Sequence, residues 1–290
     1  MGTSSQTIAE RIQKRMDDLT RAERQLALSV LENYPASGLG PLASLAKSAN
    51  VSVPTVARMV QKLGYKGYPD FQADLREELS AIAKGPIAKH ETWAGAAPSE
   101  HILNRFTEAV IDNIRTTMAH IDPVAFDDAC RLVADRSRHL YIVGGRVTHT
   151  LAEYLFLHMQ VIRPNLTHVQ STSNTWPHYL LNAGEGDVFV IFDVRRYENN
   201  TLKLAELARE RGARIVLFTD QWRSPVHRMA DICLTSQIIV PSAWDSATTT
   251  MLLVESMISA IQTLTWDSTR DRMEELEELF DKTKLFRKFT

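Results

Sequence analysis

Cysteine is scarce in this chain of 290 residues, and the two that occur, Cys130 and Cys233, each lie in an apolar segment. Neither belongs to a Cys-x-x-Cys or Cys/His cluster, so we predict buried thiols in a reducing compartment and no zinc site. Six histidines of the C-terminal part have no metal-ligand spacing either: His139, His149, His158, His168, His178 and His227. We expect no metal and no cofactor.

Long apolar runs are also missing. No stretch approaches the roughly 20 residues that span a bilayer, and residues 1–18 lack the apolar core of a secretory signal. We therefore expect a cytoplasmic protein with no membrane partner. Glycine (12) and proline (11) are too few for a fibrous or low-complexity chain, and 44% apolar residues leave room for two globular domains.

Excess positive charge is absent as well. The net charge of −2 excludes nucleic-acid binding through bulk charge, although a local patch remains possible. Such a patch exists, because no acidic residue occurs between Glu32 and Asp70. The same stretch contains four basic residues, which are Lys47, Arg58, Lys62 and Lys66.

Segment 41–63, PLASLAKSANVSVPTVARMVQKL, has the pattern of two short helices joined by a tight turn. Asn50 suits the left-handed turn conformation that most side chains avoid. Ser52 is a good N-cap, and Pro54 is tolerated in the first turn of the second helix. Before this motif, Thr20 and Glu23 form a capping-box pattern that predicts a helix start.

The residues expected to face outwards suit a DNA major groove, with short polar groups at the helix start and long donors further along. A solvated helical hairpin is the alternative, but pattern, turn, cap and charge agree on a helix-turn-helix. The predicted DNA-binding residues are Lys47, Ser52, Pro54, Thr55, Arg58, Gln61, Lys62 and Lys66.

The pattern changes in kind along the chain. Residues 1–83 read as an all-α domain, and 84–100 read as a linker because periodicity disappears there and Gly, Ala and Pro accumulate. In 101–290 a helix at 101–120 precedes strands that alternate with helices. The strand-like runs RHLYIVGG, DVFVIFDV, ARIVLFTD and ICLTSQIIV predict an α/β domain with a parallel sheet covered on both faces.

Ligands of parallel sheets bind at the carboxyl ends of the strands, so the loops there are the candidate site. Loop one, residues 144–149, and loop two, residues 193–201, combine glycines, a helix start and arginines, which suits an anion. The arginines of loop two could equally pair with Asp193, Glu198 or a partner chain. The predicted effector-binding residues are Gly144, Gly145, Arg146, Thr148, Asp193, Arg195 and Arg196.

With these residues in view, the chain resembles the RpiR family of bacterial transcription regulators over nearly its whole length. VSVPTVARMVQKLGYKGYPDFQADLRE resembles that family's helix-turn-helix, and IVGGRVTHTLAEYLF, FDVRRYENNTLKLAELARERG and DSATTTMLLVES resemble its sugar-isomerase (SIS) domain. The resemblance implies a DNA-binding regulator with a Rossmann-like effector domain.

The phosphosugar loops of SIS domains are altered in this sequence. In phosphosugar-binding SIS domains, the loop that corresponds to loop one resembles Gly-x-Gly-x-Ser. In this sequence Arg146 replaces the second glycine and Thr148 replaces the serine. Loop two resembles Ser-x-Ser-Gly-x-Thr, and its hydroxyl positions are Asp193, Arg195 and Glu198. Two of these residues are acids, which repel a phosphate. The resemblance therefore implies the SIS architecture for this chain, but it does not safely imply a sugar-phosphate effector.

The sequence favours a regulator without catalytic residues, which reads an inverted-repeat operator as a homodimer or tetramer and senses a small anionic sugar-related or carboxylate metabolite. One alternative is a SIS-type isomerase with an accessory helical domain. It would need a base, and Glu153 and Glu255 are the only acids placed for that role, although we expect both to be buried structural glutamates. In another alternative the SIS domain only dimerises.

Overall fold

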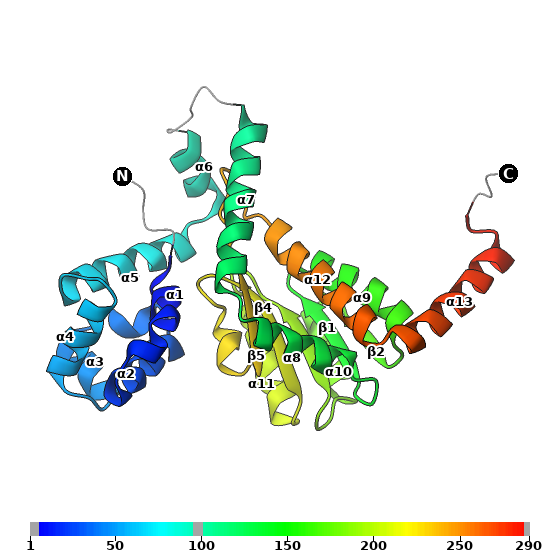
Figure 1. The fold of residues 1–290 in the computed structure, drawn as a ribbon, viewed down its shortest axis with the longest axis horizontal. Coiled ribbons are helices and arrows are strands. Elements are labelled where there is room, and N and C mark those ends of the chain that lie inside the picture. The colour runs from blue at the N-terminus through cyan, green and yellow to red at the C-terminus, as the bar shows by residue number, and fades with distance from the viewer. Residues whose placement is uncertain (1–5, 95–100, 287–290) are drawn as a thin grey trace.

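A computed structural model describes residues 6–94 and 101–286 of the chain. A helical N-terminal part lies beside an α/β part, as Figure 1 shows. This is the predicted fold class. None of the helices in the described ranges is long and apolar enough to cross a membrane.

The N-terminal part consists of helices α1 (Ile8–Lys14), α2 (Arg21–Glu32), α3 (Leu42–Ser48), α4 (Val53–Lys62) and α5 (Tyr68–Ala83). Helix α2 begins at the predicted capping box, in which Thr20 and Glu23 bond each other's backbone N–H. The helices bury a common apolar core that includes Leu26, Val56 and Phe71.

The connection between the two parts differs from the irregular linker expected for residues 84–100, of which residues 95–100 lie outside the described part of the chain. Helix α6 (Pro86–Ala94) lies there, and α7 (Ile102–His120) follows. Helix α6 has Pro86 at its start, where a missing N–H costs nothing. Its sequence has weak periodicity, and Lys89 is 7% exposed because it contacts the α/β part. That contact is tertiary, so local pattern could not reveal it.

The sheet of the α/β part is parallel throughout. Its strands are β1 (Leu140–Gly144), β2 (Leu166–Val169), β3 (Val188–Phe192), β4 (Arg214–Asp220) and β5 (Ile232–Ser236), in the spatial order β2-β1-β3-β4-β5. The predicted strand runs are confirmed, and the edge strand β2 is additional. Strands β1 and β3 are neighbours, and Gly144 pairs with Phe192 at their carboxyl ends.

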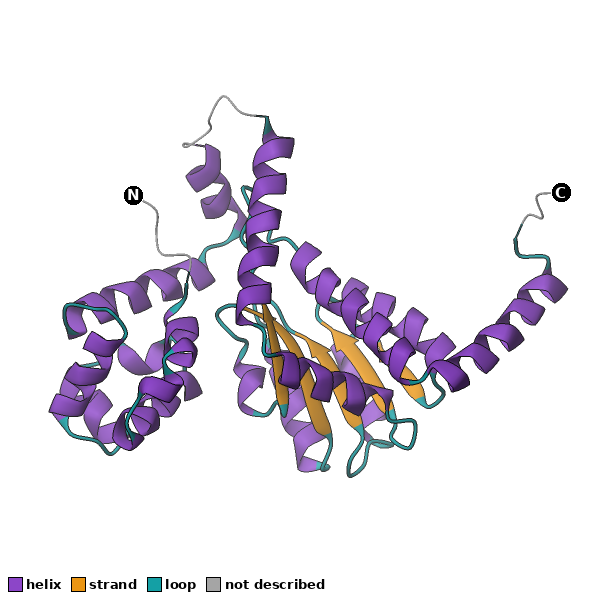
Figure 2. Cartoon of the chain, in the orientation of Figure 1, coloured by secondary structure: helices purple, strands orange, loops and turns teal. Residues whose placement is uncertain are grey.

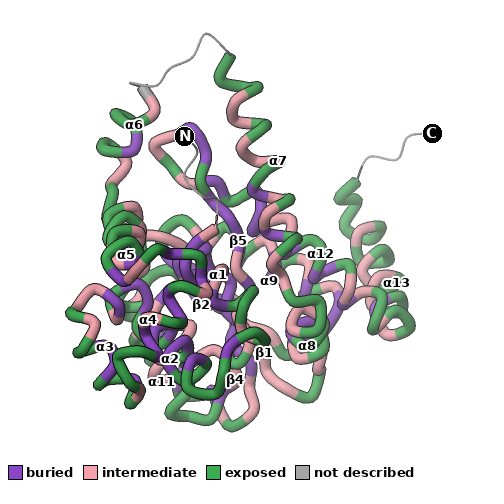
Figure 3. Tube along the Cα trace, turned by 60° about the vertical axis from the view of Figure 1, so that its left-hand side comes forward, coloured by how far each residue is buried: buried purple, intermediate pink, exposed green. Residues whose placement is uncertain are grey.

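Helices cover both faces of the sheet, as predicted and as Figure 2 shows. One face packs against α8 (Pro123–Ala134), α9 (His149–Ile162) and α12 (Thr248–Leu264). The other face packs against α10 (Trp176–Leu180) and α11 (Asn199–Glu210). The central strands β1 and β3 are accordingly buried along their length, as Figure 3 shows in purple. The last helix, α13 (Trp266–Thr283), extends away from the sheet (Figure 1).

The two parts are in contact. Trp222 and Ile238 of the α/β part belong to the apolar cluster of the helical part. Hydrogen bonds cross the same boundary, from Gln237 Nε2 to Glu10 Oε1 at 2.6 Å and between His227 Nε2 and the Leu31 carbonyl at 3.0 Å. A movement of one part must therefore break contacts with the other.

Candidate DNA-binding face and effector cavity

The local signals of segment 41–63 form the expected geometry. Asn50 has a φ of 50° in the turn between α3 and α4, the left-handed conformation predicted for it. Ser52 caps α4, because its hydroxyl accepts a hydrogen bond from the Thr55 N–H, and Pro54 lies in the first turn. Two short helices joined by a tight turn are confirmed.

Most of the predicted DNA-binding residues face solvent. The exposed members are Lys47, Ser52, Pro54, Arg58, Gln61 and Lys66. Val53 at the start of α4 is 45% exposed and was not predicted. Val53 follows the N-cap residue Ser52, and an exposed methyl group at this position suits an apolar contact with a thymine methyl. A single valine in a sequence does not indicate DNA contact, so this residue could not be predicted.

Two of the predicted residues lie differently. Thr55 is 4% exposed, and its hydroxyl lies 2.8 Å from the Ser52 hydroxyl, so the expectation that it faces outwards is wrong. Its side chain turns back onto the helix cap. Lys62 is held by the domain itself, because Nζ donates to Glu23 Oε2 at 2.7 Å and to the Asp18 carbonyl. The positive face therefore depends mainly on Lys47, Arg58 and Lys66.

Loop one and loop two meet at a cavity of about 670 Å³. It opens where the carboxyl ends of β1 and β3 lie side by side, the position at which parallel sheets bind ligands. Six of the seven predicted effector residues line it: Gly145, Arg146, Thr148, Asp193, Arg195 and Arg196. Gly144 lies behind the wall, where an added Cβ would come within 2.5 Å of the Thr148 backbone.

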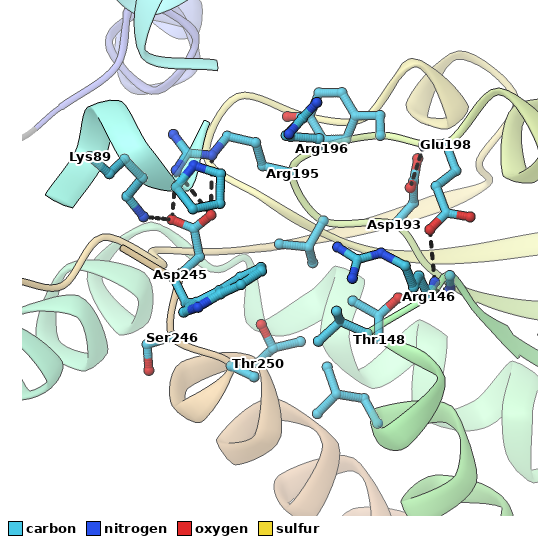
Figure 4. A pocket seen from close by; sticks show the side chains of 18 of the residues that line it. Lys89, Arg146, Thr148, Asp193, Arg195, Arg196, Glu198, Asp245, Ser246 and Thr250 are labelled. Atoms are coloured by element: carbon cyan, nitrogen blue, oxygen red, sulfur yellow. Dashed lines mark hydrogen bonds and ion pairs between the residues drawn. The ribbon is translucent and has the colours of Figure 1, made fainter. Parts of the chain in front are cut away.

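The remaining walls of the cavity come from segments that sequence reasoning did not assign to it. Lys84, Pro86 and Lys89 belong to the connection between the domains, and segment 243–247 precedes α12. Figure 4 shows Lys89 and Asp245 directly beside Arg195 of loop two. Only long-range folding brings these segments together, so no local pattern could have found them.

Arg195 is already paired inside the protein. Its guanidinium forms a bidentate ion pair with Asp245 and donates to the Ala81 carbonyl in the last turn of α5 at 2.6 Å. Lys89 Nζ lies 2.6 Å from the same carboxylate. Burial lowers the pKa of Lys89, and the nearby Asp245 opposes that shift. This buried cluster of Arg195, Asp245 and Lys89 fastens loop two to both α5 and α6.

Arg146 and Arg196 are exposed and, in the part of the chain that the structure describes, their guanidinium groups make no hydrogen bond or ion pair. Both line the cavity. Their planar donors match a carboxylate or a phosphate bidentately. Anion binding by the arginines of the two loops stays a prediction, and the pair available for it is Arg146 with Arg196, since Arg195 is paired with Asp245.

Asp193 lies at the base of the cavity and is 3% exposed. It accepts hydrogen bonds from the Ser224 hydroxyl and from the Glu198 N–H. Burial raises the pKa of Asp193 to about 7, and the neighbouring Asp220 and Glu198 add to the shift. The observed partners of Asp193 are Ser224 and Glu198, so its assignment as an effector-binding residue stays a prediction.

The other candidate groups lie away from this cavity. Glu153 and Glu255 are exposed, and neither lines it, so the expectation that they are buried structural acids is wrong. Tyr154 donates a hydrogen bond to Glu255. Cys130 is buried, and burial raises its pKa to about 12. Among the residues described, no group of three or more His, Cys, Asp or Glu could hold a metal ion.

Two family models match parts of the chain. Residues 6–82 match the helix-turn-helix domain of the rpiR family, and residues 135–260 match the SIS domain. The HTH-type transcriptional regulator HexR of Pseudomonas aeruginosa is 29% identical over 231 residues, which cover 78% of this chain and 78% of the relative.

Two solved structures are similar in fold. The sugar isomerase domain of an RpiR transcription factor from Sphaerobacter thermophilus has a TM-score of 0.55 at 22% identity, covering 61% of this chain and 97% of the other. The Vibrio vulnificus NanR protein, complexed with ManNAc-6P, has a TM-score of 0.55 at 18% identity and covers 97% of this chain and 99% of the other.

Proposed function

The chain belongs to the RpiR family of transcription regulators, and from that premise we propose that it binds operator DNA through α3 and α4 under the control of a small anion in the SIS cavity. We further propose that it acts in the cytoplasm, as a homodimer on an inverted repeat. No catalytic residue is assigned.

One observation supports the control of DNA binding most directly. Loops one and two form one side of the cavity. The connection to the helix-turn-helix domain forms the other side, through Lys84, Pro86 and Lys89. Arg195 joins the same cavity to the end of α5 through the Ala81 carbonyl. A ligand that competes for these groups changes how the helical part is held.

The charge of the lining favours an anion. Arg146 and Arg196 line it with guanidinium groups that are unpaired among the described residues, and Lys84 adds a further cation. A carboxylate or phosphate bound bidentately between two guanidinium groups gains charge-assisted hydrogen bonds that a neutral ligand cannot form.

The test is operator binding by the full-length protein, measured by fluorescence anisotropy with the gene's own upstream DNA and a panel of sugar phosphates, sugar acids and other small carboxylates. We expect an anionic member to change the affinity, and Arg196→Ala to weaken that response. Arg115→Ala is the matched control, since Arg115 is an exposed arginine on α7 outside the cavity. Specific DNA binding that no metabolite alters would favour a SIS domain that only dimerises.

A SIS-type isomerase remains the second candidate because of one observation. Asp193 lines the cavity with a pKa raised to about 7, which suits a general acid or base. Turnover of an aldose or ketose phosphate by the parent, lost in Asp193→Asn, would establish this activity. The regulator proposal expects no turnover by either protein.

A further inference from the structure

Glu198 occupies an unusual place in the cavity. It is the N-cap residue of α11, and its side chain crosses to loop one, where Oε1 accepts a hydrogen bond from the Arg146 N–H at 2.7 Å. Figure 4 shows this contact beside Asp193. The carboxylate thus lies against the loop that leads into α9.

That position is one where an anion is stabilised. The Arg146 N–H belongs to loop one, three residues before the first residue of the 14-residue helix α9, and a backbone N–H forms a charge-assisted hydrogen bond with a carboxylate. Gly145 leaves room for the approach, because an added Cβ would lie 2.6 Å from Glu198 Oε1. The fold therefore has an anion subsite at the Arg146 N–H, and the protein's own carboxylate fills it.

The neighbouring hydroxyl is not available to a ligand either. The Thr148 hydroxyl accepts from the Gly145 N–H and donates to the Phe192 carbonyl, both at 2.8 Å. A phosphate at this end of the cavity would find the N–H of Arg146 and the hydroxyl of Thr148 occupied. It would also face the negative charge of Glu198.

We propose that Glu198 is the specificity-determining residue of the cavity, which excludes phosphate from the subsite at the Arg146 N–H and selects a polyhydroxylated carboxylate. In this arrangement the ligand carboxylate binds the guanidinium groups of Arg146 and Arg196. A ligand hydroxyl donates to Glu198 Oε2, which accepts no hydrogen bond from any residue that the structure describes. Rejection by a built-in like charge is a common route to specificity. The proposal rests on the proposed function only in taking this cavity as the effector site.

The first experiment measures inorganic phosphate binding to the full-length protein by calorimetry, without DNA. Glu198→Gln keeps the side-chain shape and an acceptor for the Arg146 N–H but removes the charge. We expect it to bind phosphate at least about tenfold more tightly than the parent. Glu198→Ala empties the subsite and should gain at least as much. Glu206→Gln, on the same helix but outside the cavity, should behave as the parent.

Phosphate binding that is unchanged in both Glu198 variants would overturn the proposal. A second comparison tests the ligand class with gluconate and glucose 6-phosphate as probes. The parent should prefer gluconate, and Glu198→Gln should narrow that preference. A parent that prefers glucose 6-phosphate, or binds neither probe, contradicts the assigned class. Because no DNA is present, failure to regulate an operator would leave these results standing and would count against the proposed function alone.

Discussion

At the scale of single residues, Thr55 is a polar side chain that stabilises the helix start and does not face the DNA. Its hydroxyl is buried against Ser52 at the start of α4. We expect Thr55→Ala to lower the free energy of unfolding by about 1 kcal/mol, the usual cost of disturbing an N-terminal cap. Urea unfolding measures it, with Thr55→Ser as the control that keeps the hydroxyl. If Thr55→Ala kept the stability of the parent but changed the base preference, Thr55 would be a DNA-contacting residue and not a structural one.

Asp193 makes stability depend on pH. Burial raises its pKa from 3.8 to about 7, so between these values the folded protein keeps a proton that the unfolded chain releases. The contribution of Asp193 to stability is therefore fully present below pH 3.8 and is lost as pH rises towards 7.

Comparison with Asp193→Asn isolates this effect. Glu78 also has a pKa raised to about 7 by burial, so the parent curve contains both groups. We expect the stability of Asp193→Asn relative to the parent to increase as pH rises through the window, measured by urea unfolding at several pH values. A difference that is constant with pH would contradict the raised pKa of Asp193.

At the scale of elements, Asp245 joins loop two to α6. Its carboxylate serves both Arg195 and Lys89, whose side chains are 4% and 8% exposed. Asp245→Asn leaves two buried cations without a counter-charge, and we expect a loss of roughly 3–5 kcal/mol in unfolding free energy. Breaking the exposed Lys203–Glu206 pair by Glu206→Gln should cost only about 0–1 kcal/mol. Equal effects of the two substitutions would show that the cluster does not fasten these elements.

Elements with strong local signals could be predicted from the sequence. Helix α4 has its cap and turn residues in adjacent positions, and the central strands are continuous apolar runs because helices cover both faces. Strand β2 was missed because it is a short edge strand in which only Val169 is buried. Helix α8 was also missed, although Asp122 and Pro123 form a recognisable start.

The cavity likewise has parts that could be predicted from the sequence and parts that could not. The glycines and arginines of loops one and two were predictable, because strand ends and helix starts are local features. The walls at Lys89 and Asp245 depend on segments 156 positions apart in the sequence. The pairing of Arg195 with Asp245, and of Glu198 with the Arg146 N–H, arises only when these loops meet.

At the scale of the whole molecule, we expect a homodimer. A single helix-turn-helix binds weakly, and two on one duplex gain by effective concentration. The projecting helix α13 and its flanks carry exposed apolar residues, among them Trp266 (52%), Leu279 (50%) and Phe286 (63%). Light scattering should give twice the chain mass at micromolar concentration, and Leu279→Glu with Phe286→Glu should lower it. A monomeric parent would contradict this assembly.

Operator binding by the full-length protein tests the central claim most directly. Arg58 is an exposed long donor on α4, and we expect Arg58→Ala to weaken operator binding by about 1–3 kcal/mol and to relax the base preference. Lys66→Ala should instead weaken binding to all DNA alike and reduce its salt dependence. Anisotropy with the upstream DNA and a scrambled duplex should show specific binding by the parent that Arg58→Ala reduces. Equal binding of both duplexes by the parent, or operator affinity and specificity unchanged in Arg58→Ala, would contradict the account.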